Sequence, residues 1–191
     1  MLKPVSILAA LLAIAATLAT PQSAAAGELA GGDLPEAITV DDELLRLQGA
    51  GVFRASMFRV DVFVAGLYLG EAGSGDDKIL AEDQRWCLAL RFRRDVSQGR
   101  LIDVARRALG DRVRTSEGIS NLATLLHSIP DAAEGDILTF TYSPERGLEL
   151  AHNRRPRARI TGSEVPRALL ASWVGPSAVD GDLSRALLGM R

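Results

Sequence analysis

Few side chains in this chain have both the chemistry and the sequence context of a functional site, and Arg54 is the first. It follows the glycines of "GAGVFRASMFRVDVFVAGLYLG", an otherwise mostly apolar stretch from Gly49 to Gly70. Arginine stays charged in almost any protein environment, so a buried arginine needs an anionic partner. Arg54 is therefore a candidate to bind a ligand carboxylate or phenolate. The alternatives are an internal pair with Asp61, Asp95 or Glu43, or exposure to solvent.

Two tyrosines offer hydroxyl groups that a ligand could use. Tyr68 lies near the end of the same stretch, and Tyr142 lies in the later segment "GDILTFTY". Either can instead be a core aromatic whose hydroxyl reaches an edge. In one unbroken strand, the 14 residues from Arg54 to Tyr68 would span roughly 46 Å. If both line one cleft, the chain must reverse between them, and we predict the reversal near Ala55 to Met57.

The sequence carries no pattern typical of metal, phosphate or nucleophilic chemistry. His127 and His152 are too few and too far apart to suggest a metal site. The single cysteine, Cys87 in "RWCLALRF", is predicted to be a small buried apolar residue that forms no internal disulfide. There is no G-x-S-x-G elbow, and "GAG" lacks the spacing of a phosphate loop. We therefore predict no metal and no cofactor, and we name no catalytic residue.

Alternating apolar residues predict the strands that would position these side chains. Val60 to Leu69 is apolar on both parities, which is typical of a central strand buried on both faces. Val62, Val64 and Tyr68 should share one face, and Phe63 should lie on the other. Further strands are predicted in these segments: "ITVDDELLRLQ" as a hairpin turning at Asp41-Asp42, "RWCLALRF", "GDILTFTY", and "GLELAHNRRPRARI" as a hairpin turning at Asn153-Arg154 with Pro156 on an edge strand.

Helices are predicted between and after these strands. The expected helices run from Ser97 to about Leu109, from near Glu117 to His127, from Ser163 to before Gly175, and from about Asp182 to Leu188. The order is strands, helices, strands, helices. That order predicts an α+β fold in which helices pack on one face of a large antiparallel sheet.

The first 26 residues are expected to be a signal peptide rather than part of this domain. Lys3 precedes an apolar run of about 15 residues, and an A-x-A cleavage site follows at Ala24 to Ala26. The run is short for a membrane span, which needs about 20 residues. An uncleaved anchor is the alternative. We therefore expect a periplasmic or secreted protein whose domain covers residues 27–191.

The charge balance argues against a nucleic-acid partner. The chain has 22 basic and 24 acidic residues, for a formal net charge of −2 at pH 7. Proteins that bind nucleic acids usually present a basic patch or stripe. The residues alone thus predict a secreted α+β domain with room for an apolar ligand.

Four blocks, taken together, resemble the chalcone isomerase-like family in its bacterial secreted branch. They are "LQGAGVFRASMFRVDVFVAGLYLG", "LRFRRDVSQGRLIDVARRAL", "IPDAAEGDILTFTYSP" with the hairpin that follows, and "ARITGSEVPRALLASWVGPSAVDGDLSRALLG". The resemblance covers about Leu34 to Gly189. It implies an open-faced β-sandwich, in which a large antiparallel sheet is covered on one face by helices and a ligand cleft lies between them.

The same resemblance implies two possible activities. Plant chalcone isomerases close a chalcone into a flavanone, using an Arg after Gly-x-Gly, a Thr on the next strand, and a Tyr and an Asn on a helix. Other members bind fatty acids and hold the carboxylate with the Arg and a Tyr. Here the Arg maps best to Arg54, although Phe53 stands directly after Gly-x-Gly-Val, and Phe63 occupies the Thr position. The helix near Glu117 to His127 has no Tyr, and its only Asn is Asn121.

These residues lead to three hypotheses. The first is a non-catalytic protein that binds a small hydrophobic acid such as a fatty acid, with Arg54, Tyr68, Tyr142 and Phe63 as the ligand-binding residues. Apolar walls and one fixed charge suit such a ligand. The second is an intramolecular lyase of the chalcone isomerase type acting on an enone. The third is a scaffold or partner-binding domain whose cleft is filled by side chains. Oligomeric state is not predicted.

Overall fold

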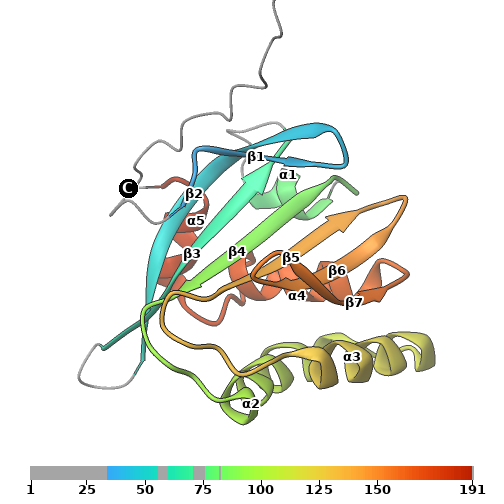
Figure 1. Cartoon of the computed structure of the whole chain (residues 1–191). Helices are drawn as coiled ribbons and strands as arrows, with labels where there is room; N and C mark the ends of the chain where they lie inside the picture. The colour runs from blue at the N-terminus through green and yellow to red at the C-terminus, as the bar shows by residue number, and fades with distance from the viewer. Residues whose placement is uncertain (1–33, 56–59, 71–75, 82, 191) are drawn as a thin grey trace, which may run out of the picture.

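The structure, a computed structural model, describes residues 34–55, 60–70, 76–81 and 83–190, so the predicted signal peptide lies outside the described residues. Within them, seven antiparallel strands form one sheet in sequence order, from β1 to β7 (Figure 1). The strands are β1 (Ala37–Val40), β2 (Glu43–Ala55), β3 (Val60–Leu69), β4 (Trp86–Phe92), β5 (Ile137–Ser143), β6 (Gly147–His152) and β7 (Arg155–Ile160). Because each strand pairs with its sequence neighbour, short turns suffice between most strands.

Both predicted hairpin turns are confirmed. Asp41 and Asp42 have φ values of 51° and 66°, and Asn153 and Arg154 have 51° and 65°. Positive φ at both central residues is the geometry of a type I′ turn, whose twist matches that of paired strands. Pro156 lies in β7, at the edge of the sheet, as predicted.

The central position of β3 is also confirmed, because it pairs with β2 on one side and β4 on the other and is buried from Val62 onwards. Arg54 lies opposite Asp61, so the chain does reverse between Arg54 and Tyr68. The predicted place of the reversal, near Ala55 to Met57, extends beyond the described residues, which stop at 55 and resume at 60. One prediction for this strand is wrong: Val62 packs in the helix-side core and not with Val64 and Tyr68.

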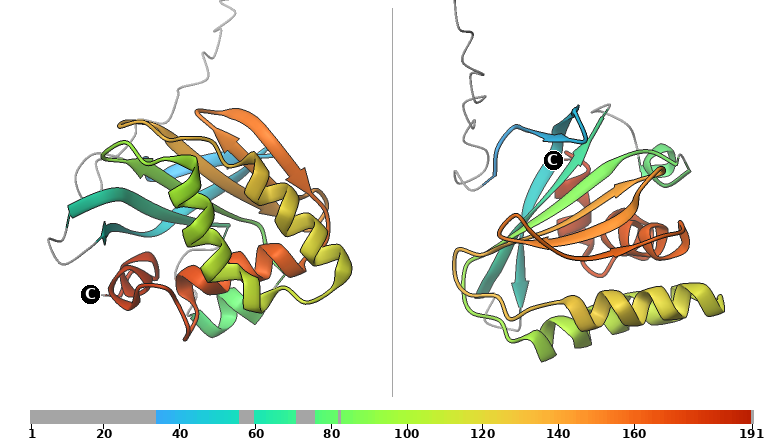
Figure 2. Two further views of the ribbon diagram at one scale, coloured as in Figure 1. Left: turned by 90° about the horizontal axis from the view of Figure 1, so that it is seen from below. Right: turned by 45° about the vertical axis from the view of Figure 1, so that its right-hand side comes forward.

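The helices pack on one face of the sheet (Figure 2). They are α1 (Asp76–Ala81), α2 (Gln98–Leu109), α3 (Ser116–Ser128), α4 (Glu164–Val174) and α5 (Gly181–Leu187), with a short 3-10 turn, η1 (Gly110–Arg112), after α2. The sheet twists strongly from β1 to β7. Helices α2 and α3 lie next to each other on its helix-covered side (Figures 1 and 2). No helix among the described residues is long and apolar enough to cross a membrane.

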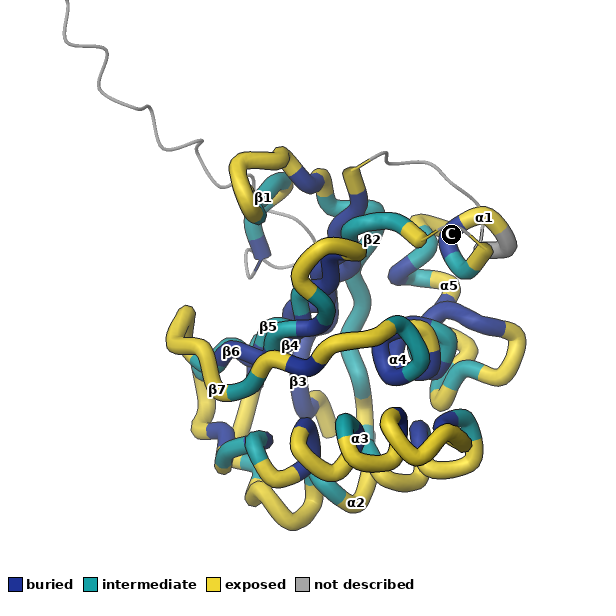
Figure 3. The backbone as a smooth tube through the Cα atoms, turned by 90° about the vertical axis from the view of Figure 1, so that its right-hand side faces the viewer, coloured by how far each residue is buried: buried dark blue, intermediate teal, exposed yellow. Residues whose placement is uncertain are grey.

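The core has two parts on opposite faces of the sheet. The larger lies between sheet and helices and includes Phe63, Leu90, Phe140 and Leu169. The smaller lies on the other face, where Leu34 and β1 cover Tyr68 and Cys87. In Figure 3, β3, β4 and α4 are mostly buried, whereas α2 and α3 expose most of their outer surface. The α+β fold with helices on one face is as the sequence predicted.

Candidate functional site

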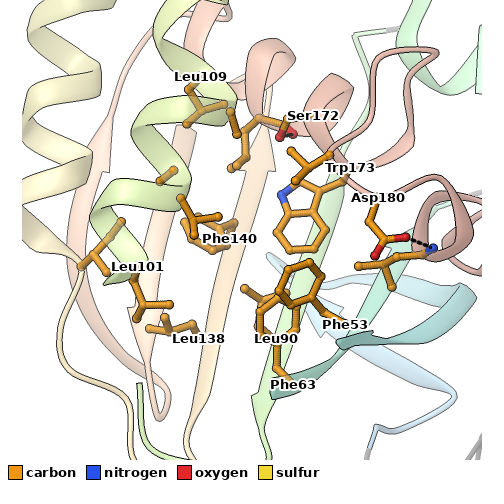
Figure 4. A pocket seen from close by; sticks show the side chains of 17 residues that line it. Phe53, Phe63, Leu90, Leu101, Leu109, Leu138, Phe140, Ser172, Trp173 and Asp180 are labelled. Carbon is orange, nitrogen blue, oxygen red and sulfur yellow. Dashed lines mark hydrogen bonds between the residues drawn. The ribbon is translucent and has the colours of Figure 1, made fainter. Parts of the chain in front are cut away.

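A small apolar cavity lies between the sheet and the helices (Figure 4). Its volume is about 90 Å³. The walls come from β2, β3, β4 and β5 on the sheet side and from α2, α4 and α5 on the helix side, and nearly all of them are aliphatic or aromatic. The side chains that Figure 4 labels are Phe53, Phe63, Leu90, Leu101, Leu109, Leu138, Phe140, Ser172, Trp173 and Asp180.

An aromatic cluster forms one wall of this cavity. Phe53 on β2 and Phe63 on β3 are directly opposite each other, and their rings stack with centroids 4.9 Å apart and planes 12° from parallel. The ring of Trp173, on α4, lies 5.9 Å from that of Phe63. Phe92 meets Phe63 edge-on at 5.6 Å. Such pairs add to the free energy gained by burying the rings, so this wall is a stable apolar surface.

The two glycines before Phe53 explain why it faces the cavity. A Cβ on Gly49 would lie 2.2 Å from the carbonyl oxygen of Ala186, and a Cβ on Gly51 would lie 2.7 Å from the Cβ of Ala186. Only glycine therefore lets α5 pack against this face of β2. Phe53 follows on the same face, because side chains alternate along a strand. The "GAG" motif is a packing motif for the last helix.

The two polar residues at the cavity are already hydrogen-bonded within the protein. Ser172 Oγ donates to the carbonyl oxygen of Leu169 at 2.7 Å. Asp180 caps α5, because its Oδ1 accepts from the N–H groups of Asp182 and Leu183, each at 3.0 Å. Both polar groups therefore already have hydrogen-bond partners within the protein. The lining of the cavity favours an apolar ligand group.

A larger groove adjoins the cavity on its outer side. Its volume is about 400 Å³, and Phe53, Phe63, Leu101 and Val104 line both spaces. The remaining groove residues are Ala55, Val62, Arg94, Asp95, Val96, Arg100, Asp103 and Arg107. The apolar cavity and the charged groove are thus neighbouring spaces that share part of one wall, at Phe53 and Phe63.

Arg54, the first predicted site residue, lies outside both spaces. Its Nε donates to Asp61 Oδ1 at 2.8 Å, and the two side chains are 47% and 50% exposed. This is one of the internal pairs that the sequence left as an alternative. A bulge explains the orientation: the register passes from Phe53–Phe63 to Arg54–Asp61, so Val62 is the extra residue on β3. Asp61 thereby moves to the same face as Arg54.

Tyr68 and Tyr142 are both buried, at separate places. Tyr68 belongs to the smaller core on the opposite face of the sheet, and its hydroxyl donates to the carbonyl oxygen of Pro35 at 2.9 Å. Tyr142 packs against Trp86 and donates to Asp83 at 2.8 Å, and it does not line the cavity. Burial and the Asp83 carboxylate raise the pKa of Tyr142 to about 12. Both hydroxyls are used within the protein.

Of the four predicted site residues, the structure therefore places only Phe63 at the cavity. Leu90 and Phe140 line it too, whereas Leu67 and Trp86 do not. Sequence reasoning missed Trp173 and the α2 residues. For the α2 residues, the available signal was the helical spacing of the apolar residues Leu101, Val104, Ala105 and Ala108. That spacing predicts a helix but not the position of the helix over a cavity.

Other candidate chemistry is absent from the described part of the chain. No group of three or more His, Cys, Asp or Glu residues there could hold a metal ion. Cys87 is buried, and burial raises the pKa of its thiol to about 11, so it stays protonated and unreactive at neutral pH. Asn121 donates to the carbonyl oxygen of Thr161 and lies in a polar groove between α3 and α4, away from the apolar cavity.

Comparison with known proteins gives a family and a fold. The family model described as chalcone isomerase-like matches residues 26–189. Among solved structures, a fatty-acid binding protein of Arabidopsis thaliana is similar, with 16% sequence identity and a TM-score of 0.63 over 81% of this chain and 90% of that one. At that identity the likeness shows the fold alone. No curated protein sequence matches the chain.

Proposed function

The chain belongs to the chalcone isomerase-like family, and from that premise we propose that it binds a small hydrophobic acid, such as a fatty acid, without transforming it. The observation that carries the proposal is the apolar cavity with the stacked Phe53–Phe63 pair in its wall. The similar Arabidopsis protein is a fatty-acid binding protein, and its likeness in fold supports the same class of ligand.

The two adjoining spaces suit an elongated ligand better than a compact one. The inner cavity, at about 90 Å³, is far smaller than the roughly 300 Å³ at which ligand pockets begin. The outer groove, at about 400 Å³, falls within that range. An acyl chain lying in the groove would thus reach the cavity past Phe53 and Phe63. Burial of each CH₂ group contributes about 0.8 kcal/mol, which makes an acyl chain a favourable occupant.

The residues at the family's catalytic positions argue against the isomerase reaction. The resemblance places an Arg and a Thr near positions 53–54 and 63. Phe53 and Phe63 are the residues that face the cavity there, and Arg54 is paired with Asp61 on the other face. A developing oxyanion needs hydrogen-bond donors, and a stacked phenylalanine pair supplies none. We expect cyclisation of hydroxychalcones at no more than the spontaneous rate, measured by absorbance.

A lipid-binding experiment tests the proposal. Purified protein is titrated with dodecanoate and hexadecanoate and observed by native mass spectrometry. Ala105, on the cavity side of α2, is replaced by Phe to fill the cavity, and Ala123→Phe at an exposed position of α3 is the matched control. We expect one bound acyl chain, affinity at least about tenfold weaker in Ala105→Phe, and no change in Ala123→Phe.

Two results would overturn the proposal. One is the absence of fatty-acid binding by the unsubstituted protein. The other is equal affinity of all three proteins, which would place the ligand elsewhere. Circular dichroism of each variant establishes that a lost affinity is not a lost fold.

A second candidate function, a scaffold or partner-binding domain, is favoured by the small volume of the inner cavity. Side chains already fill most of the space between sheet and helices there. This alternative predicts that the purified protein carries no lipid and that Ala105→Phe raises its melting temperature by filling a void. Lipid extraction followed by mass spectrometry separates the two functions.

We also infer that the protein is exported. The basis is the three-part pattern of residues 1–26, which lie outside the described residues. N-terminal sequencing of protein from the periplasm or medium should begin at Gly27; a chain that keeps its Met1 in the cytoplasm would contradict the inference.

A further inference from the structure

The groove outside the cavity carries arginines that the fold does not use. Arg94, just before α2, and Arg100 and Arg107, on α2, all line it and are all exposed. No hydrogen bond or ion pair with a described residue engages the side chain of any of the three. By contrast, Arg54 is paired. An unpaired cation beside an apolar wall is available to an anionic group of a ligand.

The α2 residues form a stripe that alternates charge and apolar surface. Arg100, Val104 and Arg107 recur at helical spacing and so lie on one face. Arg100 and Arg107 are two turns apart, about 10.5 Å along the axis. Val104 lies between them and is 43% exposed, which is unusual for a valine that also lines the inner cavity. A ligand over this face would meet apolar surface flanked by two guanidinium groups.

The acidic residues of the groove do not cancel this charge. Asp95 lines it, but its Oδ1 accepts from the backbone N–H of Glu134 at 2.9 Å. Asp103 lies 3.8 Å from Arg106, which is not a groove residue. Three arginines thus face two aspartates; Asp103 lies near the Arg106 guanidinium, whereas Asp95 keeps its charge beside a neutral N–H donor. The groove keeps an excess of positive charge beside the apolar surface of Phe53 and Phe63.

We propose that Arg100 and Arg107, with Arg94, bind the anionic head group of a single-chain amphiphile whose tail passes Phe53 and Phe63 into the cavity. This deepens the function proposed above and rests on it. In this proposal the anchor of the head group is on α2, and not at Arg54 on β2 as the sequence predicted. Leu109 is the only fully buried residue among the twelve of α2, so much of the anchoring helix is accessible to a ligand.

The test compares ligands with the same tail and different heads. Dodecanoate, dodecyl phosphate and dodecanol, each below its aggregation concentration, displace the neutral probe N-phenyl-1-naphthylamine. We expect the protein to bind both anions about tenfold more tightly than dodecanol, which is what two partly exposed ion pairs together contribute. The preference should shrink as salt is raised. Equal affinity for dodecanoate and dodecyl phosphate indicates a charge-only site; a difference identifies the preferred head.

Two arginine variants and two controls locate the anchor. In Arg100→Gln/Arg107→Gln, dodecanoate affinity should fall to that of dodecanol, while dodecanol affinity stays the same and so reports an intact fold. Arg54→Gln, on the outer face of β2, and Arg157→Gln, exposed on β7, remove the same charge elsewhere and should keep the preference.

The outcomes separate the two proposals. A double variant that still prefers the anions would overturn the anchor while leaving acyl-chain binding in place. Loss of the preference for anions in Arg54→Gln alone would also overturn the anchor on α2, and would identify Arg54 as the anchor instead. Absence of probe displacement by all three ligands in the unsubstituted protein would overturn the proposed function, and the anchor with it.

Discussion

Two adjacent cross-strand pairs on the β2–β3 hairpin have opposite environments. Phe53 and Phe63 face the helices, stack on each other and line the cavity. Arg54 and Asp61, one step along, face away from the helices and form an ion pair that is about half exposed. Arg54, which the sequence predicted as the residue that binds an anionic ligand group, therefore lies on the side of the sheet without the cavity. Its neighbour Phe53 lines the cavity.

The difference shows how one extra residue in a strand changes which side chains lie on each face of a sheet. Without a bulge, Asp61 and Phe63 would share a face, because side chains alternate with period two. The bulge at Val62 breaks that alternation, so Asp61 pairs with Arg54, while Val62 and Phe63 both join the helix-side core. Charge is thereby kept off the apolar face of the hairpin.

The apolar pair should dominate stability. Phe63 is 7% exposed and contacts three aromatic rings. Phe63→Ala should therefore lower the free energy of unfolding by about 3–5 kcal/mol. Urea denaturation followed by tryptophan fluorescence measures it, since Trp173 lies beside Phe63. A loss below 1 kcal/mol would mean that the aromatic wall is not packed as described.

The glycines that set the orientation of β2 should be nearly as sensitive. Gly49→Ala places a methyl group 2.2 Å from a backbone oxygen of α5, which cannot move without displacing the helix. We expect a loss of about 1–3 kcal/mol, seen as a lower melting temperature. Gly110→Ala, where a Cβ meets nothing within 4 Å and the backbone is helical, is the matched control and should be neutral or slightly stabilising.

A polar cluster around Asp136, just before β5, contrasts with the exposed Arg54 pair because it is partly buried. Hydrogen bonds from the Asn153 side chain, the Ala133 N–H and His152 lower the pKa of Asp136 to about 2. A depressed carboxyl pKa gives stability above the unfolded value of about 3.9 that is lost as pH falls towards 2. Stability should thus drop across this window. In Asp136→Asn, the drop between pH 4 and pH 2 should be smaller; an unchanged drop would contradict the assignment.

The smallest effect is expected for the exposed ion pair. Arg54→Ala should change the free energy of unfolding by less than about 1 kcal/mol, because an exposed pair gains little over its hydration. A double-mutant cycle with Asp61→Ala measures the coupling. A coupling above 2 kcal/mol would show that the pair matters more to the hairpin than its exposure implies.

Much of the fold was readable from the sequence, because its signals are local. The turns at Asp41-Asp42 and Asn153-Arg154, the two-sided burial of β3 and the edge position of Pro156 follow from alternation and from turn chemistry. Helices α2, α3, α4 and α5 begin and end within one or two residues of the predicted positions.

The candidate site was less predictable, because it depends on register and on distant packing. Alternation puts Val62 with Val64, and only the observed bulge corrects this. The "GAG" glycines gave no local hint that α5 packs on them. Trp173 reaches Phe63 only through the docking of α4 on the sheet. The positions of Tyr68 and Tyr142 in the sequence likewise do not indicate which face of the sheet holds the cavity.

The central claim is that the ligand lies on the Phe53–Phe63 side of the hairpin, and photo-crosslinking tests it most directly. A fatty acid with a diazirine at its tail end is bound, irradiated, and mapped by peptide mass spectrometry with unlabelled hexadecanoate as competitor. We predict competed crosslinks on cavity residues of β2, β3 and α2, such as Phe53, Phe63 and Leu101. Competed crosslinks confined to the opposite face around Tyr68 and Arg54, or none above the competitor control, would contradict the account.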